Sequence, residues 1–229
     1  YRMFVSILFF PALLVLLTRR LRGEETWGQL AQRLGLSSVQ TDKDVPQLWL
    51  HAASNGELNS ALPLLDLIQQ DYSDFAIILT CNSLSGVELA GKNGYVAQLS
   101  PLDFRWSIKR FLKSRTVSAY IAVESEIWPN RIHLLHNASV PCMLIGARLS
   151  RRSSQTWARF SNIAQSTLAK INYVSAQDTA SKDRFVLLGL RSEAIGVTLN
   201  LKGLFQPKRP VLSRKSRVPI CLAASTHPK

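Results

Sequence analysis

Short runs of apolar and β-branched residues alternate with helical segments through most of this chain of 229 residues. Strands that alternate with helices in this way are joined by crossover helices into a parallel sheet. The sequence therefore predicts an α/β fold with one parallel sheet and flanking helices. No GxGxxG motif follows the first predicted strand, which argues against a dinucleotide-binding site.

The predicted elements follow one another in a regular order. A first helix is expected within 26–36, before the sheet begins. Strands are predicted at 47–54, 75–81, 95–100, 117–125, 140–147, 172–177 and 194–199. Helices are predicted at 57–70, 84–92, 104–114, 128–137, 153–170 and 179–189.

The N-terminus carries a different signal. Residues 3–17, "MFVSILFFPALLVLL", are almost wholly apolar, and the basic sequence "TRRLRG" follows at once. The run is shorter than the roughly 20 residues that a spanning helix needs. We therefore predict a membrane anchor helix at 1–22 that dips into one leaflet, with its arginines on the anionic cytoplasmic surface. A buried core helix is the alternative, and a few residues before Tyr1 would make the segment long enough to span.

Composition divides the rest of the chain. Residues 23–202 form the predicted α/β domain, and residues 203–218 are rich in Pro, Lys and Arg, as expected of a linker. Residues 219–229 contain "ICLAAST", which predicts the first strand of a second, truncated domain. The sequence offers no cluster with the spacing of metal ligands.

The formal net charge of +13 indicates a polyanionic partner, although a generally basic surface is an alternative. Residues 104–115, "FRWSIKRFLKSR", combine basic and aromatic side chains, which also occurs in nucleic-acid-binding helices. The same spacing is typical of an amphipathic helix that packs on a sheet, and we favour that interpretation, with no nucleic-acid partner.

Polar residues follow several predicted strands, at the edge where open parallel sheets bind ligands. Most such residues cap helices, but two acids and two bases on one rim make a better case for a site. Glu57 lies in the first turn of its helix, where the helix dipole favours a carboxylate, and Gly56 allows close approach of a substrate. The rim residues are Ser54, Asn55, Glu57, Glu124, Glu126, Arg148, Ser150, Gln177, Asp178 and Lys202.

A series of motifs resembles a known family. "HAASNGE", "VESEIWPN", "ARLSRRS", "VSAQDTASKDRFVLLG", "LNLK" and "AASTH" occur in this order. They are similar to the motifs of the 3-deoxy-D-manno-octulosonic acid (Kdo) transferases of lipopolysaccharide assembly, and the resemblance covers nearly the whole chain.

The resemblance implies the N-terminal half of a GT-B glycosyltransferase, a pair of Rossmann-like domains. The implied reaction is an inverting transfer of Kdo from CMP-Kdo to a lipid A precursor, at the cytoplasmic face of the inner membrane. The donor belongs to the missing C-terminal domain, and no cofactor is implied. Glu57 matches the general base, and Glu124 and Lys202 match residues that stabilise the transition state. Substrate-binding residues are expected at Ser54, Asn55, Gly56, Trp128, Arg148, Ser150, Gln177 and His227.

The chain also departs from the family pattern. Asn55 replaces a common hydrophobic residue, "LNLK" replaces a G-S-L-K type sequence, and "GLF" replaces the usual F-D. We expect no turnover from the chain alone, because most of the nucleotide-binding domain is absent from it. The competing hypothesis is a non-catalytic, basic membrane-surface module that binds anionic lipid and does not need Glu57.

Overall fold

A computed structural model describes residues 9–36, 44–124 and 126–204 of the chain. Six parallel strands form one sheet in the order β3-β2-β1-β4-β5-β6. The predicted α/β fold with a parallel sheet and flanking helices is confirmed. The strands are β1 (Gln47–His51), β2 (Ala76–Cys81), β3 (Ala97–Leu99), β4 (Val117–Val123), β5 (Cys142–Ala147) and β6 (Tyr173–Ala176).

Helices connect the strands, and further helices precede β1 and follow β6 in the chain. The helices before β4 are α2 (Phe9–Leu21), α3 (Trp27–Arg33), α4 (Asn55–Asp71), α5 (Leu84–Lys92) and α6 (Arg105–Lys113). Those after β4 are α7 (Pro129–Asn137), α8 (Arg151–Ala158), α9 (Ser161–Leu168), α10 (Thr179–Leu187) and α11 (Leu201–Leu204), with a 3₁₀ turn η1 (Ser192–Ala194) between the last two.

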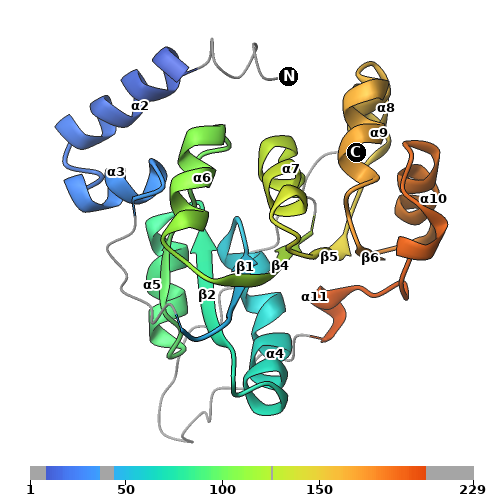
Figure 1. Ribbon diagram of the computed structural model, residues 1–229, viewed down its shortest axis with the longest axis horizontal. Coiled ribbons are helices and arrows are strands. Elements are labelled where there is room, and N and C mark those ends of the chain that lie inside the picture. The colour runs from blue at the N-terminus through green and yellow to red at the C-terminus, as the bar shows by residue number, and fades with distance from the viewer. Residues whose placement is uncertain (1–8, 37–43, 125, 205–229) are drawn as a thin grey trace, which may run out of the picture.

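The sheet is covered on both faces, and each face has its own apolar core. Figure 1 shows α4 on one side of the sheet and α6 and α7 on the other. Side chains alternate along a strand, so Trp49 of β1 joins Ile108 and Phe111 of α6 in one core. Its neighbour Leu50 joins the opposite core, which contains Leu58 of α4.

Helix α6 illustrates how an amphipathic helix fits this arrangement. It buries Ser107, Ile108 and Phe111 and exposes Lys109 and Arg110. The interpretation of residues 104–114 as a helix packed on the sheet is therefore confirmed. The question of nucleic acid binding is separate and stays a prediction.

The predicted anchor lies partly outside the described residues, which begin at Phe9. Helix α2 packs beside α3 and buries Leu16, while Phe10 and Leu21 are 75% and 86% exposed. None of the helices formed by the described residues combines the length and the apolar character needed to cross a bilayer. The predicted linker and second domain, 203–229, fall largely outside the described residues.

Two predicted elements are wrong. Residues 194–199 form no strand, since η1 occupies their start and a single bridge joins Ile195 to Val174 of β6. The long helix expected at 153–170 is two helices, because the backbone of Phe160 leaves the helical conformation. The break lets α9 turn Ala164 and Leu168 into the core, whereas α8 buries no residue completely.

Candidate functional site

The order of the strands reverses at the centre of the sheet. Strand β1 lies between β2 and β4, and the chain leaves β1 toward β2 but leaves β4 toward β5, on the other side. Open parallel sheets bind ligands at such a switch point, beyond the carboxyl ends of the strands. Glu57 follows β1 here, and Glu124 and Glu126 follow β4.

Glu57 is the predicted base, and its carboxylate is half-buried at the start of α4. Its Oε2 accepts a 2.8 Å hydrogen bond from the Ala53 N–H, and Ser54 Oγ lies 3.3 Å from Oε1. Ser54 caps α4 by accepting from the Glu57 N–H. Burial is the largest cause that raises the pKa of Glu57 to about 7, and the charges of Glu126 and Glu124 act in the same direction, while the hydrogen bonds from Ala53 and Ser54 oppose them.

A carboxylate with this pKa exchanges protons near neutral pH, as a general base must. The same hydrogen bonds also serve as a helix cap, so capping and proton transfer are both available to Glu57. The Oε1 atom has only a long contact from a hydroxyl among the described residues. The Glu57 residue is partly exposed to solvent.

Glu124 and Lys202 form an ion pair across the rim. Their Oε1 and Nζ atoms lie 2.7 Å apart, and their side chains are 22% and 56% exposed. Glu124 stands directly after β4 with a φ of +58°, an uncommon conformation for a residue other than glycine. Its N–H still donates to the Ile145 carbonyl of β5, so the backbone turns without losing its pairing.

Lys202 reaches Glu124 because α11 docks on β5. Leu201 is buried against Gly146, where a Cβ atom would lie 3.0 Å from the leucine Cδ1. Gly146 has a φ of +64° at a register shift between β5 and β6, a conformation that glycine adopts at little cost. The glycine thus lets α11 approach the sheet and sets the position of the lysine.

Glu126 is held by Trp128 and His51. Trp128 Nε1 donates to Glu126 Oε2 over 2.7 Å, and His51 Nε2 lies 3.4 Å from the same oxygen. Burial alone would raise the pKa of Glu126, but His51, Trp128 and the charge of Arg131 outweigh it and hold that pKa below its usual value. Burial and the Arg131 charge lower the pKa of His51, so its imidazole is neutral at pH 7.

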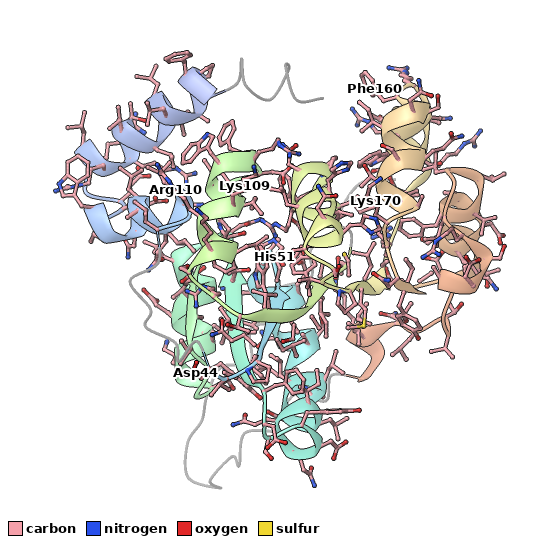
Figure 2. The ribbon with its side chains drawn as sticks, viewed as in Figure 1. Asp44, His51, Lys109, Arg110, Phe160 and Lys170 are labelled. Carbon is pink, nitrogen blue, oxygen red and sulfur yellow. The ribbon has the colours of Figure 1, made fainter. Side chains whose placement is uncertain are left out.

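The buried side chain of Arg131 packs against Trp128, which contacts Glu126. Its guanidinium donates to the Tyr120 hydroxyl, to Ser100 Oγ and to the Pro101 carbonyl. It also lies over the rings of Trp49, Tyr120 and Trp128, at 4.9, 5.8 and 5.9 Å from their centroids. Figure 2 shows His51 in the interior of the molecule.

The other predicted binding residues lie on the same edge, but most have structural partners. Asn55 Oδ1 accepts from Ser85, Ser150 caps α8, and Gln177 Nε2 donates to Asn200 Oδ1. Arg148 is exposed and its charge acts on Asp178. These contacts do not link them to the three carboxylates. A Cβ at Gly56 would meet only Ser54 Oγ, at 3.9 Å, so no close backbone approach within the described protein requires this glycine, and His227 lies outside the described residues.

Sequence reasoning missed the support of the site. His51 and Arg131 were not proposed as functional residues, although each is a polar residue in a buried position. One signal was available: His51 ends an apolar strand and opens the quoted motif "HAASNGE". Its partner Glu126 is 75 residues away, and that distance hides the pair from local pattern analysis.

Comparison with known proteins decides the family. A family model described as 3-deoxy-D-manno-octulosonic-acid transferase (kdotransferase) matches residues 28–204. The chain belongs to the Kdo transferase family. The match spans the whole described sheet, including Glu57, Glu124 and Lys202.

Members of the Kdo transferase family resemble the chain over most of its length. It is 32% identical to the 3-deoxy-D-manno-octulosonic acid transferase of Haemophilus influenzae, over 87% of the chain and 49% of that protein. It is 30% identical to the probable mitochondrial enzyme of Arabidopsis thaliana, over 80% of the chain and 42% of that protein. The chain spans about half the length of these curated relatives.

Solved structures support the fold of this Kdo transferase family member. The S. aureus MnaA–UDP co-structure matches with a TM-score of 0.54 at 10% identity, over 74% of the chain and 49% of that structure. The UDP-GlcNAc 2-epimerase of Neisseria meningitidis matches with a TM-score of 0.50 at 13% identity, over 69% and 47%. At these identities the likeness concerns the fold alone.

Proposed function

We propose that this chain is the acceptor-binding half of a glycosyltransferase that moves Kdo from CMP-Kdo to a sugar hydroxyl of a lipid A precursor. The observation that carries the proposal is the position of Glu57. A carboxylate with a pKa of about 7 lies half-buried at the switch point of a parallel sheet, close to the Glu124–Lys202 ion pair. The identity of the transferred sugar, Kdo, is inferred from family membership and from the names of the relatives.

In the proposed reaction, Glu57 removes the proton of the acceptor hydroxyl as its oxygen bonds to the anomeric carbon of Kdo. The bond between that carbon and the CMP phosphate breaks on the opposite side, so the configuration inverts. A single base is enough for such a displacement. The partial burial of Glu57 raises its basicity, and proton transfer benefits from that.

In this proposal, the ammonium group of Lys202 lies near the negatively charged groups of the donor. The leaving CMP gains charge on its phosphate, and Kdo itself carries a carboxylate. A fixed ammonium group near these oxygens stabilises the transition state more than the ground state. The proposal assigns Glu124 to holding this ammonium, because the two side chains are 2.7 Å apart. A second Rossmann-like domain would hold CMP-Kdo, and no cofactor is needed.

The proposed location is the cytoplasmic face of the inner membrane. The exposed apolar side chains of Phe10, Leu14, Val15, Leu21 and Trp27 lie on α2 and at the start of α3. Figure 1 shows these helices next to α6, and Figure 2 places Lys109 and Arg110 on α6. Apolar side chains beside basic ones suit a surface that rests on anionic lipid.

This surface also favours the competing hypothesis of a non-catalytic lipid-binding module. The two functions differ in their need for Glu57. The test is the substitution Glu57→Gln in a longer protein that contains residues 1–229, assayed for transfer from CMP-Kdo to a lipid A precursor. We expect a loss of about 10²–10⁴-fold with an unchanged fold.

The exposed Glu193→Gln is the matched control, since Glu193 pairs with Arg191 away from the site. Full transfer by Glu57→Gln would refute the proposed base and favour the lipid-binding module. Vesicle binding by both variants would be equal under either hypothesis.

A further inference from the structure

Three arginines are exposed at the carboxyl end of β5, where the chain enters α8. These residues, which we call the arginine cluster, are Arg148, Arg151 and Arg152. Within the same loop Leu149 is buried, its N–H donates to Ser181 Oγ over 3.1 Å, and its carbonyl accepts from Arg184 over 2.8 Å. Because both partners belong to α10, the backbone that carries the cluster is fixed to a neighbouring helix (Figure 1).

The first turn of α8 carries these charges against the usual preference of a helix. Arg151 and Arg152 are its first two residues, and this turn contains no acid. The N-terminal end of a helix dipole is positive, so cations there destabilise the helix. Packing does not explain them, because α8 buries none of its residues completely, and the ion pairs of the described residues include neither guanidinium. A departure from a local rule without a structural gain points to a functional site.

Positive charge exceeds negative charge on this part of the rim. Asp178, the acid that follows β6, is exposed and caps α10 through its Oδ1 atom. The charges of Arg148 and Arg184 both act on this carboxylate. Arg151 and Arg152 therefore add to a surface on which one acid already faces two cations. Such a surplus suits a ligand with several negative oxygens, because each guanidinium can donate two parallel hydrogen bonds to a phosphate.

The arginine cluster lies close to the residues of the proposed reaction. Arg148 directly follows β5, and Glu124 directly follows β4, the strand that pairs with β5. The Glu124 N–H donates to the Ile145 carbonyl, so the two strand ends lie side by side. Neighbouring strands are about 4.8 Å apart, which puts a ligand on the cluster roughly 5–10 Å from the Glu124–Lys202 ion pair. A substrate held there by one group can present another group at the switch point of the sheet.

We propose that the arginine cluster binds a phosphate group on the sugar acceptor and so holds the acceptor beside Glu57. The inference rests on the proposed function, in which this chain is the acceptor-binding half and the acceptor is a phosphorylated lipid A precursor. Charge complementarity favours this occupant, since three guanidinium groups meet a phosphate dianion. The phosphate belongs to the acceptor and not to CMP-Kdo, because the proposed second domain holds the donor. The cluster binds, and Glu57 still takes the proton.

The first test measures binding to this chain and needs no catalysis. The probe is the deacylated sugar head of a lipid A precursor, a glucosamine disaccharide with two phosphates, and the same disaccharide without phosphates is the control ligand. In a titration followed by amide NMR, the signals of Arg151 and Arg152 should move with the phosphorylated probe only. The unmodified chain is used, so the result does not depend on the folding of a variant. Equal shifts with both ligands, or no shift at the cluster, would overturn the inference.

Neutral substitutions in the cluster provide the second test. Arg151→Gln/Arg152→Gln removes two charges, and we expect about tenfold weaker binding of the phosphorylated disaccharide. Lys92→Gln/Arg159→Gln removes the same charge from exposed positions at the C-terminal ends of α5 and α8, and should bind like the wild type. Equal weakening by both pairs would indicate general electrostatics and refute the site. If CMP displaces the disaccharide from the cluster at a lower concentration than the disaccharide itself needs, the phosphate is that of the donor and the proposed occupant is wrong.

A third measurement separates this inference from the proposed function. In a longer protein with transfer activity, Arg151→Gln/Arg152→Gln should raise the KM for the acceptor about tenfold, and a rise in the KM for CMP-Kdo instead would contradict the inference. Glu57→Gln should lose turnover and keep phosphate-dependent binding. If Glu57→Gln keeps full transfer while the phosphorylated probe still binds the cluster, the proposed base fails and the phosphate site stands. If the probe does not bind, the inference fails whatever the transfer assay gives.

Discussion

Lys202 and Glu124 meet at a distance of 2.7 Å although 78 residues separate them in the chain. The contact joins the first residue after β4 to the short helix α11, which packs on Gly146 of β5 through Leu201. It places a cation beside the Glu124 carboxylate, at the point where the order of the strands reverses. The behaviour of this pair is open to direct measurement.

The pair should act as one unit in catalysis. We expect Lys202→Met and Glu124→Gln each to lower kcat/KM for Kdo transfer by about 10²-fold, and the double variant to lose little more than either single one. The reason is that either change removes the held ammonium. A double-mutant cycle in a longer protein that contains this chain provides the measurement. Additive losses would show independent roles, and the Arg191→Met/Glu193→Gln pair, an exposed ion pair elsewhere, is the control.

Stability should depend on pH through Glu57. Its pKa is raised in the folded state to about 7, so the folded chain binds more protons than the unfolded chain between about pH 4.5 and 7. The free energy of unfolding therefore falls as pH rises through this window. Glu57→Gln removes this pH-dependent loss. We expect the free energy of unfolding of the variant to exceed that of the wild type by about 1–2 kcal/mol at pH 8, after allowance for solvent screening, and to equal it at pH 4. Urea unfolding at the two pH values tests this, and an equal effect at both would contradict it.

Helix α7 should depend on a cap from outside the helix. Asp103 accepts hydrogen bonds from the N–H groups of Asn130 and Arg131, while Trp128 at the N-cap position offers no side-chain cap. Asp103→Ala should cost about 1–2 kcal/mol of unfolding free energy, because two buried donors lose their acceptor. Thermal or urea unfolding measures this. The exposed Asp183→Ala should change stability by less than about 0.5 kcal/mol.

Membrane binding should depend on the basic side of α6. Lys109→Glu reverses one exposed charge next to α2 and α3, and we expect about tenfold weaker binding to vesicles that contain phosphatidylglycerol. Raised salt should reduce the difference between this variant and the wild type. Arg159→Glu makes the same charge change beside Phe160, which Figure 2 shows at the right of the view, away from α2 and α3 at the left. Equal weakening by both variants would indicate general electrostatics and no preferred surface.

The sequence was enough to predict the parallel sheet, because each strand is a short apolar run with a helix behind it. It was also enough to predict that Glu57, Glu124 and Lys202 lie on one rim, through the order of strands and the family motifs. The failed strand at 194–199 has a local cause. Gly196 sits against the ring of Tyr173, so the segment runs beside β6 with few backbone hydrogen bonds.

The contacts of His51 and Trp128 with Glu126 were beyond sequence reasoning for a different reason. His51 ends a strand and Trp128 precedes a helix, and neither position indicates a contact with Glu126. These contacts depend on the pairing of β1 with β4, a tertiary contact that spacing alone does not encode.

The left-handed backbone of Glu124 has a consequence for anyone who tries to make this domain more heat-resistant. An asparagine adopts that conformation more readily than a glutamate, and the exchange would relieve up to about 1 kcal/mol of local strain. The shorter, uncharged asparagine side chain would no longer form the ion pair with Lys202. Selection for higher stability would thus act against the carboxylate that the proposed reaction needs, and a melting temperature that rises as turnover vanishes would reveal this trade-off.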